Sequence, residues 1–587
     1  MRVPRHPDRA AHQKLRGGEL RSRLPQHDHA AIAALIFAAA GLFPLLAALR
    51  HLDDNSLTSW SWVLEGRDLV GLWVLHLAAV AVAWALSRLA LPGPAAVALA
   101  TFTAGIALRG EPEAIVDASR YFVQAKHLAQ HGARAFLGDW GGILPAWTDL
   151  PLAPFLYGTT LRLAGEHRLP IQLLTAGLFA LTGYATARIG GLLWSGESGA
   201  RAALLLLAVP CLLVQVPLLM ADVPSMAAVT LALWAFLALL ERGSTARFAA
   251  AALAIAAALL AKYSTWVLLG GTCGAILAIE ACRGRRTALV RGGAAALTGA
   301  LAPALYALAK PEVVERQIGL LAGFQREGLL RWVESYPSTF LFQAHPLLAV
   351  GAGVALWRGL RGRDARVLVA AALPLLLLAL GVRRSRYLLP AFPMLALLAA
   401  RGLEPLAPRA RRFAALAAVG FSLVMVFAAY LPFLHWVNTA NLQAAGRYLD
   451  GRGVRAAEVV ALPAPGVAIN PEVAVPLLDY HTAARITVRG PAPARPPEDT
   501  VRTSSFRFSW EQRLPSWYRS VDPPPSGAAL VLISGDPLAP RPAAIAERVG
   551  SRPPDAVFAR DAVFRYRTYV SVWLPAEMAA PAGRAAP

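Results

Sequence analysis

The stretch EPEAIVDASRYFVQAKHLAQHG, residues 111–132, places three carboxylates, Glu111, Glu113 and Asp117, between two strongly apolar runs. Apolar runs recur from residue 30 to residue 434. Each is long enough to cross a bilayer as a helix, which takes roughly 20 residues. The chain is therefore predicted to be a polytopic α-helical membrane protein. The three acids would then lie in a loop at one membrane face.

The composition of the 587-residue chain agrees with this class. Hydrophobic residues make up 56% of the chain and charged residues only 16%, whereas about a quarter of a typical soluble chain is charged. The net charge of +21 would ordinarily suggest nucleic acid, but the arginines cluster in short loops between apolar runs. The charge therefore indicates membrane topology and contact with anionic membrane lipids, with no nucleic acid.

We predict about thirteen transmembrane helices, at residues 30–50, 67–87, 93–109, 169–194, 199–220, 224–240, 246–263, 265–282, 289–309, 341–359, 366–382, 385–401 and 412–434. Counting along these spans puts the arginine-rich loops 283–291, 358–366 and 401–412 on the same side as the N-terminus. The positive-inside rule makes that side the cytoplasm. We therefore expect a multi-pass protein of the cytoplasmic (inner) membrane of a bacterium, whose other loops face the periplasm.

The predicted domains are a cytoplasmic basic tail 1–29, two additional N-terminal transmembrane helices 30–92, a membrane domain 93–434 with an outer loop 110–168, and an extracytoplasmic C-terminal domain 435–587. The last contains the alternating apolar runs AAEVVAL (456–462), AALVLIS (528–534) and AVFRYRTYVSVWL (562–574), which are typical of strands. The Pro-rich RGPAPARPPEDT (489–500) is typical of a loop. The tail is thus predicted to form a small α/β domain.

Residues 116–132 have the pattern of an amphipathic helix that starts at Asp117. Glu113 and Asp117 are four residues apart, so a continuous helix would put both on one face. A simpler interpretation makes Asp117 the N-cap of this helix. A capping carboxylate is itself held in place, so the two roles are compatible.

A second acid and several cations also lie at the predicted outer boundary. MADVPSMAAVTLALWAF (220–236) puts Asp222 at the outer end of a helix, where it is either a turn residue or part of a site shared with Asp117. LLAKYSTW contributes Lys262, and GVRRSRYLLPAFP contributes a basic loop that ends in Arg386 and Tyr387. These cations either contact lipid head groups or bind an anionic group. Arginine suits phosphate because its planar fork donates paired hydrogen bonds.

Carboxylates and phosphate-binding cations on the outer face suit transfer from a lipid-linked phosphate donor. A carboxylate would accept the proton of an acceptor hydroxyl, and the cations would stabilise the departing phosphate. Sugar nucleotides stay in the cytoplasm, so an outward-facing site implies a lipid-carried donor. The chain has no P-loop and no convincing dinucleotide motif.

The motifs resemble those of the membrane glycosyltransferases with the GT-C fold. These are Asp117-x-x-x-Tyr121 in the first outer loop, Asp222-x-Pro, Arg386-Tyr387-x-x-Pro and a C-terminal outer domain. The resemblance covers residues 93–434 and is closest to the family 39 and aminoarabinose-transferase-like group, which includes protein O-mannosyltransferases. It implies that Asp117 is the general base, that Asp222 is the second acid, and that Arg386 binds the donor phosphate. Lys262 is a second candidate for that phosphate.

The resemblance extends to further residues. Tyr387 and Arg383 are predicted to help bind the donor phosphate. The predicted sugar or acceptor contacts are Glu113, Tyr121, Trp147 and Asp149; Trp147 is alternatively a membrane-interface anchor. Asp117 is followed by Ala118, where many relatives have a second acid, and WTDLPLAPFLYG (147–158) lacks the Lys-Pro-Pro of aminoarabinose-type relatives. No cofactor is required by the sequence. If a divalent cation, Mg²⁺ or Mn²⁺, takes part, Asp117 or Asp222 is expected to hold it.

The sequence thus predicts a hexosyl- or pentosyltransferase that moves a sugar from a polyprenyl-phosphate donor to an extracytoplasmic hydroxyl. The acceptor would be a protein, a lipid or an envelope glycan, and the resemblance implies inversion by single displacement. One alternative is a lipid or glycan transporter or flippase, which would favour charges near mid-helix. Another is a non-catalytic scaffold, which would follow if Asp117, Asp222 and Arg386 lay more than about 20 Å apart.

Overall fold

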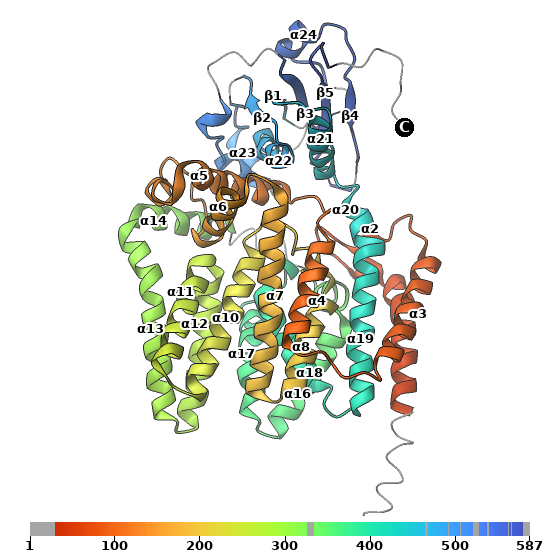
Figure 1. The fold of residues 1–587 in the computed structure, drawn as a ribbon, viewed down its shortest axis with the longest axis vertical. Helices are drawn as coiled ribbons and strands as arrows, with labels where there is room; N and C mark the ends of the chain where they lie inside the picture. Colours follow the sequence, from red (N-terminus) through yellow and green to blue (C-terminus); the bar gives the residue numbers. More distant parts are fainter. Residues whose placement is uncertain are drawn as a thin grey trace, which may run out of the picture.

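The computed structural model describes residues 30–325, 334–463, 468–490, 492–504, 506–519, 527–536, 539–561, 563–564 and 566–578. A bundle of long, roughly parallel helices carries a layer of shorter helices at one end, and a small α/β domain lies above that layer (Figure 1). The predicted fold class, a helical membrane protein with a C-terminal α/β region, is confirmed. The predicted basic tail 1–29 lies outside the described residues.

Seven of the described helices are long and apolar enough to cross a membrane: Ala30–Ala48, α3 (Leu69–Leu86), α7 (Arg168–Leu193), α10 (Asp222–Glu241), α12 (Ser264–Cys282), α13 (Arg286–Ala309) and Pro408–Leu434, which comprises α19 (Pro408–Met425), η6 (Val426–Tyr430) and α20 (Leu431–Leu434). Three shorter apolar helices stand beside them: α4 (Pro94–Ala107), α11 (Thr245–Ala261) and α17 (Ala365–Ala379). The remaining helices of the bundle are α8 (Gly196–Leu205), α16 (Pro346–Arg361) and α18 (Phe392–Gly402). The total of thirteen spans stays a prediction.

Three predicted spans are not continuous helices. The span predicted at 341–359 is interrupted at His345, whose extended backbone separates η4 (Ser338–Ala344) from α16. The span predicted at 199–220 is broken into α8, η2 (Leu206–Ala208) and α9 (Pro210–Leu213), because Pro210 has no N–H to continue the helical hydrogen bonds. The span predicted at 385–401 begins instead as η5 (Ser385–Ala391), with Pro390 inside it, before α18 starts. The break at η5 leaves the chain irregular at the end of the bundle that carries the α/β domain.

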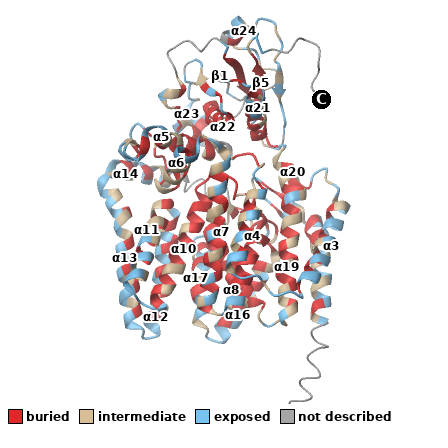
Figure 2. Ribbon diagram, viewed as in Figure 1, coloured by how far each residue is buried: buried red, intermediate tan, exposed pale blue. Residues whose placement is uncertain are grey.

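Large apolar side chains cover the outside of the bundle. On α13, Leu297, Leu301, Leu305 and Leu308 follow one another at three- or four-residue spacing and are 57% to 79% exposed. Figure 2 shows this exposed outer surface next to the buried helices at the centre of the bundle. A continuous apolar stripe of this kind is unusual on a soluble protein and is expected of a helix that faces lipid.

The shorter helices form a layer at one end of the bundle. They are α5 (Ile115–Asp139), α6 (Leu152–Ala164) and α14 (Pro311–Leu320), and the chain around them also forms η1 (Arg50–Leu52), α2 (Trp60–Val63), η3 (Leu321–Gln325) and η4 (Ser338–Ala344). In α5 the apolar face points inward, as the amphipathic pattern predicts, and Phe122 packs against Tyr480 of the C-terminal region with their ring centroids 4.9 Å apart. Lys126 also donates to Asp479 Oδ2 at 2.7 Å. The layer is therefore joined to the α/β domain by both packing and charge.

The C-terminal sheet has the strand order β2-β1-β3-β5-β4. The strands are β1 (Ala456–Ala461), β2 (Arg485–Val488), β3 (Ala529–Ser534), β4 (Ala556–Phe558) and β5 (Tyr569–Trp573). Strand β1 pairs in parallel with β2 and β3, while β5 pairs antiparallel with β3 and β4. The accompanying helices are α21 (Thr439–Gly451), η7 (Pro471–Val473), α22 (Ala474–Tyr480), α23 (Glu498–Thr503), η8 (Arg507–Glu511), η9 (Ser516–Tyr518) and α24 (Ala543–Val549).

Three predicted strands correspond to β1, β3 and β5, although the run 562–574 forms a strand only over Tyr569–Trp573. Strands β2 and β4 were not predicted, because four and three residues are too few to show an alternating pattern. The Pro-rich run 489–500 forms no strand in its described part, and α23 starts at its end.

Candidate active site

Asp117 lies in the first turn of α5, which begins at Ile115 after Ala114 as its N-cap. The predicted start at Asp117 is two residues late, and the prediction that Asp117 caps the helix is wrong. Glu113 precedes the helix, so the two acids do not share a helical face. A carboxylate in the first turn is favoured by the helix dipole, and the Asp117 side chain is left free to bind other groups.

Arg386 joins Asp117 to Asp222. Its Nη1 donates to Asp117 Oδ2 at 2.7 Å and its Nε donates to Asp222 Oδ2 at 3.0 Å. Lys262, the C-cap of α11, donates from Nζ to Asp222 Oδ1 at 2.7 Å. Four residues from α5, α10, α11 and η5 thus form one cluster, which we call the acid–base cluster. Asp117, Asp222 and Arg386 are thus in direct contact, and not more than about 20 Å apart as the scaffold alternative would imply.

A second group of polar residues supports the acid–base cluster from α5. Arg120 Nη2 lies 3.3 Å from Asp117 Oδ1 and donates to Asp149 Oδ1 at 3.0 Å. Tyr121 also donates its hydroxyl to Asp149 Oδ1 at 3.0 Å, and Gln124 Nε2 donates to Asp149 Oδ2 at 3.3 Å. Asp149 and Tyr121 are buried and bonded to each other. Asp149 is therefore connected to Asp117 through Arg120, which contacts both acids.

Aromatic rings line the cations of the site. The Arg120 guanidinium lies 5.6 Å from the Trp147 ring and 5.4 Å from the Phe508 ring, and these two rings lie 4.8 Å apart. Lys262 Nζ lies 5.2 Å from the Tyr387 ring. Cations are attracted to ring faces at such distances. The C-terminal region thus contributes Phe508 to the edge of the site.

Two predicted site residues lie apart from the acid–base cluster. Glu113 is fully buried, pairs with Arg168 at 2.7 Å and accepts the N–H of Leu219 at 2.8 Å, so it ties α7 to the segment before α10. The Arg383 guanidinium lies 5.1 Å from the ring of Tyr336. Among the described residues it forms no ion pair with Asp117 or Asp222. The predicted phosphate and sugar contacts at these two positions remain predictions.

Charge compensation keeps Asp117 ionised. Burial alone would raise its pKa, but the guanidiniums of Arg386 and Arg120 outweigh that effect and hold the pKa of Asp117 well below its usual range. Burial alone would lower the pKa of Arg386, but the carboxylates of Asp222 and Asp117 outweigh that effect and raise it. By contrast, burial raises the pKa of Asp149 despite its pairing with Arg120. Asp117 is therefore held as a carboxylate, whereas burial favours the neutral form of Asp149.

The donor set does not suit a divalent cation. No cluster of three or more metal-ligating side chains occurs among the described residues. Both Asp117 oxygens already face guanidiniums, and both Asp222 oxygens accept hydrogen bonds from Arg386 and Lys262. A metal ion would have to displace one of these cations.

The sequence analysis missed Arg120 and Phe508. Arg120 was not among the predicted site residues, yet it is only 6% exposed and lies 3.3 Å from Asp117. Its spacing of three residues from Asp117 was a usable signal, since such pairs meet on a helix. Phe508 lies about 390 residues further along the chain than Asp117, and no local pattern indicates that η8 reaches α5.

Glu334 lies behind the loop that carries Arg386 and accepts the N–H of Ser385 at 2.9 Å. Burial raises the pKa of Glu334 from 4.5 to about 7, against the opposing effects of Ser385 and Arg384. A carboxyl whose pKa is higher in the folded state stabilises the fold fully below the unfolded pKa. That stability is lost as the pH rises through the folded pKa. For Glu334 the free energy of unfolding should therefore fall by on the order of 3 kcal/mol between about pH 4.5 and pH 7.

Glu334→Gln should therefore remove this pH dependence, because glutamine keeps an oxygen for Ser385 and carries no charge. We expect the variant to unfold at a higher temperature than the wild type at pH 8 and at the same temperature at pH 4. Thermal unfolding of the detergent-solubilised protein measures this. Glu65→Gln, an exposed residue, is the control. A difference that stays constant from pH 4 to pH 8 would exclude Glu334 as its cause.

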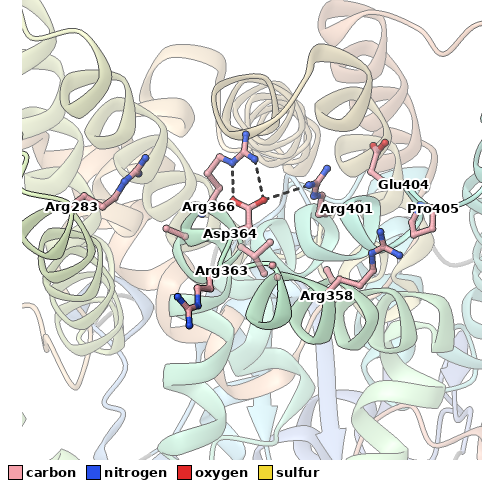
Figure 3. Close-up of a pocket in the computed structure, with 13 residues that line it drawn as sticks. Arg283, Arg358, Arg363, Asp364, Arg366, Arg401, Glu404 and Pro405 are labelled. Carbon is pink, nitrogen blue, oxygen red and sulfur yellow. Dashed lines mark hydrogen bonds and ion pairs between the residues drawn. The ribbon is translucent and has the colours of Figure 1, made fainter. Parts of the chain in front are cut away.

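A basic pocket of about 800 Å³ lies at the opposite end of the bundle. It is lined by Arg283, Arg358, Arg363, Arg366 and Arg401, together with Asp364 and Glu404. Asp364 is held by Arg366 at 2.8 Å and by Arg401 at 3.4 Å (Figure 3). The pocket belongs to the arginine-rich loops 283–291, 358–366 and 401–412, and it is remote from the acid–base cluster.

The chain was compared with family models, curated sequences and solved structures. A family model described as dolichyl-phosphate-mannose-protein mannosyltransferase matches residues 148–309. The matched segment contains Asp222 and Lys262 but not Asp117 or Arg386. A comparison with curated protein sequences found no match.

Solved structures resemble nearly the whole chain. ArnT from Cupriavidus metallidurans bound to undecaprenyl phosphate has a TM-score of 0.52 at 15% identity, over 87% of this chain and 99% of that chain. Apo ArnT from the same organism gives 0.50 at 14% identity with the same coverage. The Archaeoglobus fulgidus oligosaccharyltransferase in complex with zinc and sulfate gives 0.41 at 12% identity, over 74% and 68%. The chain therefore shares its fold with ArnT.

Proposed function

We propose that this GT-C chain is an integral-membrane glycosyltransferase that uses a polyprenyl-phosphate sugar as donor and an extracytoplasmic hydroxyl as acceptor. The observation that carries the proposal is the acid–base cluster, in which one guanidinium bridges Asp117 and Asp222 while Lys262 binds the second acid. Such a cluster combines a proton acceptor with cations for a leaving phosphate. The family model and the fold support the same class of reaction.

In the proposed reaction Asp117 accepts the proton of the acceptor hydroxyl. The acceptor oxygen forms a bond to the anomeric carbon, and the bond from that carbon to the phosphate oxygen breaks in the same displacement, which inverts the centre. The electron pair leaves with the phosphate, whose charge Arg386 and Lys262 stabilise. Asp222 holds both cations in place. The sugar is a hexose or a pentose, and the acceptor is a protein, a lipid or an envelope glycan.

Arg386 can bind a phosphate without leaving the acids. Its Nε and Nη1 donate hydrogen bonds to Asp222 and Asp117, while Nη2 donates none to the described residues. An anion at Nη2 would share the guanidinium charge and weaken its hold on Asp117. The pKa of Asp117, depressed in this state, would then rise towards its ordinary value. Donor binding would thus make Asp117 a stronger base at the moment it is needed.

The proposed orientation places the acid–base cluster outside the cytoplasm. The arginine pocket marks the cytoplasmic end by the positive-inside rule, and the cluster and the α/β domain lie at the other end (Figure 1). The ionisable groups of the cluster therefore lie at a membrane boundary. This position favours a transferase over the transporter alternative, for which charges near the bilayer midplane are typical.

The C-terminal domain is proposed to shape access of the acceptor. Gln512 Nε2 donates to Ser119 Oγ of α5 at 2.7 Å, and the neighbouring Phe508 lies over Arg120. These contacts put a segment of the domain beside the first turns of α5. An acceptor that approaches Asp117 from outside would pass this segment.

Lys262→Gln should weaken donor binding more than it slows the chemical step. Loss of one charge-assisted hydrogen bond to phosphate costs about 1.5–3 kcal/mol, or roughly a 10- to 100-fold rise in the donor KM. Initial rates at varied donor concentration measure the change. Lys310→Gln is the matched control, since Lys310 is a surface lysine that donates to the Gly138 carbonyl. Equal donor KM values for the two variants would remove Lys262 from the phosphate site.

The proposed function is tested by supplying membranes that contain the protein with a panel of radiolabelled polyprenyl-phosphate sugars. The membranes are prepared with their native envelope components, so that acceptors are present. We expect one donor to transfer its label to a membrane or protein acceptor. If no donor in a panel of hexoses and pentoses loses its sugar, while ArnT in parallel membranes consumes its own donor, the proposal fails.

A further inference from the structure

The loop between the two N-terminal helices is polar but buried. Asp53, Asn55, Thr58 and Ser59 are between 2% and 8% exposed, although side chains of these types usually lie at the surface. Buried polar groups are stable only when they are hydrogen-bonded. The partners of this loop therefore indicate what it is built to hold.

Asp53 is the centre of the loop's network. Its carboxylate accepts hydrogen bonds from Ser338 Oγ at 2.6 Å, from Gln343 Nε2 at 2.9 Å and from the Trp60 N–H at 2.8 Å. Two of these donors belong to η4. Thr58 Oγ1 also donates to Gln343 Oε1 at 3.0 Å. The N-terminal loop and η4 are thus fixed to each other about 285 residues apart in sequence.

The same hydrogen-bond network also contacts residues 383–387, which we call the arginine loop. Asn55 Nδ2 donates to Ser385 Oγ at 3.1 Å, while Asn55 Oδ1 accepts the N–H groups of Leu57 and Thr58 at 2.9 and 2.7 Å. The amide of Asn55 is therefore used at both ends, and its orientation is fixed. Ser385 is the residue immediately before Arg386.

Two further bonds hold the arginine loop. The Ser385 N–H donates to Glu334, and Thr339 Oγ1 of η4 donates to the Arg383 carbonyl at 2.6 Å. The backbone just before Arg386 is therefore held by η4 and Glu334, while Asn55 holds the side chain of Ser385. None of these bonds involves the acids that Arg386 bridges.

We propose that the N-terminal helical pair is a positioning element, whose residue Asn55 sets the placement of Arg386 through Ser385. The proposal rests on the proposed function of Arg386 as the donor-phosphate ligand. Arg386 must meet Asp117, Asp222 and the phosphate together, and a misplacement of about 1 Å in such a group is costly to a reaction. Asn55 thus adds a contact to those that Glu334 and Thr339 make with the same loop.

The test is a double-mutant cycle of Asn55→Ala and Ser385→Ala. We expect each single variant to raise the donor KM about three- to tenfold, with a smaller change in kcat, and the double variant to be no worse than either single one. Additive effects, or a fall in kcat at unchanged KM, would overturn the proposal. Ser385→Ala keeps the backbone bond to Glu334, so it reports on Arg386 even if Asn55→Ala folds poorly.

Hydrogen exchange of the purified protein tests the same proposal without any donor. We expect Asn55→Ala to speed exchange of amides in residues 383–389 and to leave α5 and α10 unchanged. Asp68→Ala is the control on the same helical pair, because Asp68 only accepts the Gly71 N–H at 2.9 Å as the cap of α3. Unchanged exchange in 383–389, or equal effects of the two variants, would overturn the proposal. Failure of the wild type to use any donor would instead count against the proposed function.

Discussion

Asp117→Asn is expected to lower kcat for sugar transfer by about three orders of magnitude. Asparagine has nearly the same shape as aspartate and keeps one oxygen for Arg386 or Arg120, so the site should stay assembled. It cannot accept the proton of the acceptor hydroxyl. The donor KM should change little, because the phosphate ligands Arg386 and Lys262 remain. Initial rates of the purified protein at saturating donor measure the effect.

Asp139→Asn is the matched control for this prediction. Asp139 lies at the far end of α5 and bonds to His127 at 2.9 Å, away from the acid–base cluster. Its variant should retain the wild-type kcat. Equal kcat for Asp117→Asn and the wild type, at equal protein abundance, would reduce Asp117 to an ion-pair partner of Arg386 and would require another base.

Arg386→Ala should abolish transfer and destabilise the protein. Removing the bridging guanidinium leaves Asp117 and Asp222 as neighbouring, poorly compensated carboxylates, and breaking a buried ion pair in this way costs about 3–5 kcal/mol. Arg386→Lys keeps the charge but lacks the fork that reaches two acids, so it should recover part of the stability and little of the activity. Thermal unfolding and transfer rates measure the two effects.

The destabilisation by Arg386→Ala should depend on pH. Arg386 lowers the pKa of Asp117, so its contribution to stability is present above the unfolded pKa and is lost as the pH falls through the folded pKa. The stabilities of mutant and wild type should therefore begin to converge as the pH falls below about 4, where the unfolded chain takes up protons, and should meet only below the depressed folded pKa of Asp117. Arg316→Ala, an exposed arginine of α14, is the control. A pH-independent loss of stability would point to packing rather than charge.

The helical part of the fold could be predicted because lipid imposes a simple requirement on sequence. An apolar run long enough to cross the bilayer can hardly be anything else, so the ends of α3, α7 and α10 fall close to the predicted ones. The breaks at Pro210 and at η5 were missed because both lie in runs that are still apolar on average.

The acid–base cluster could be predicted in part because charged residues are rare beside membrane spans. Asp117, Asp222, Lys262 and Arg386 stood out against their apolar neighbours, and the resemblance gave them a common role. Contacts made by distant parts of the chain left no such signal. The bond of Asn55 to Ser385 spans 330 residues, and no local pattern connects the polar loop 53–59 with the arginine loop.

The most direct measurement of the central claim uses purified protein in sealed proteoliposomes that carry a labelled polyprenyl-phosphate sugar in both leaflets. The account predicts that the wild type converts this donor to polyprenyl phosphate and moves the label to an acceptor hydroxyl supplied from the side of the α/β domain, while Asp117→Asn does neither. Movement of intact donor between the leaflets, with no release of polyprenyl phosphate by any member of the donor panel, would contradict it and identify a transporter.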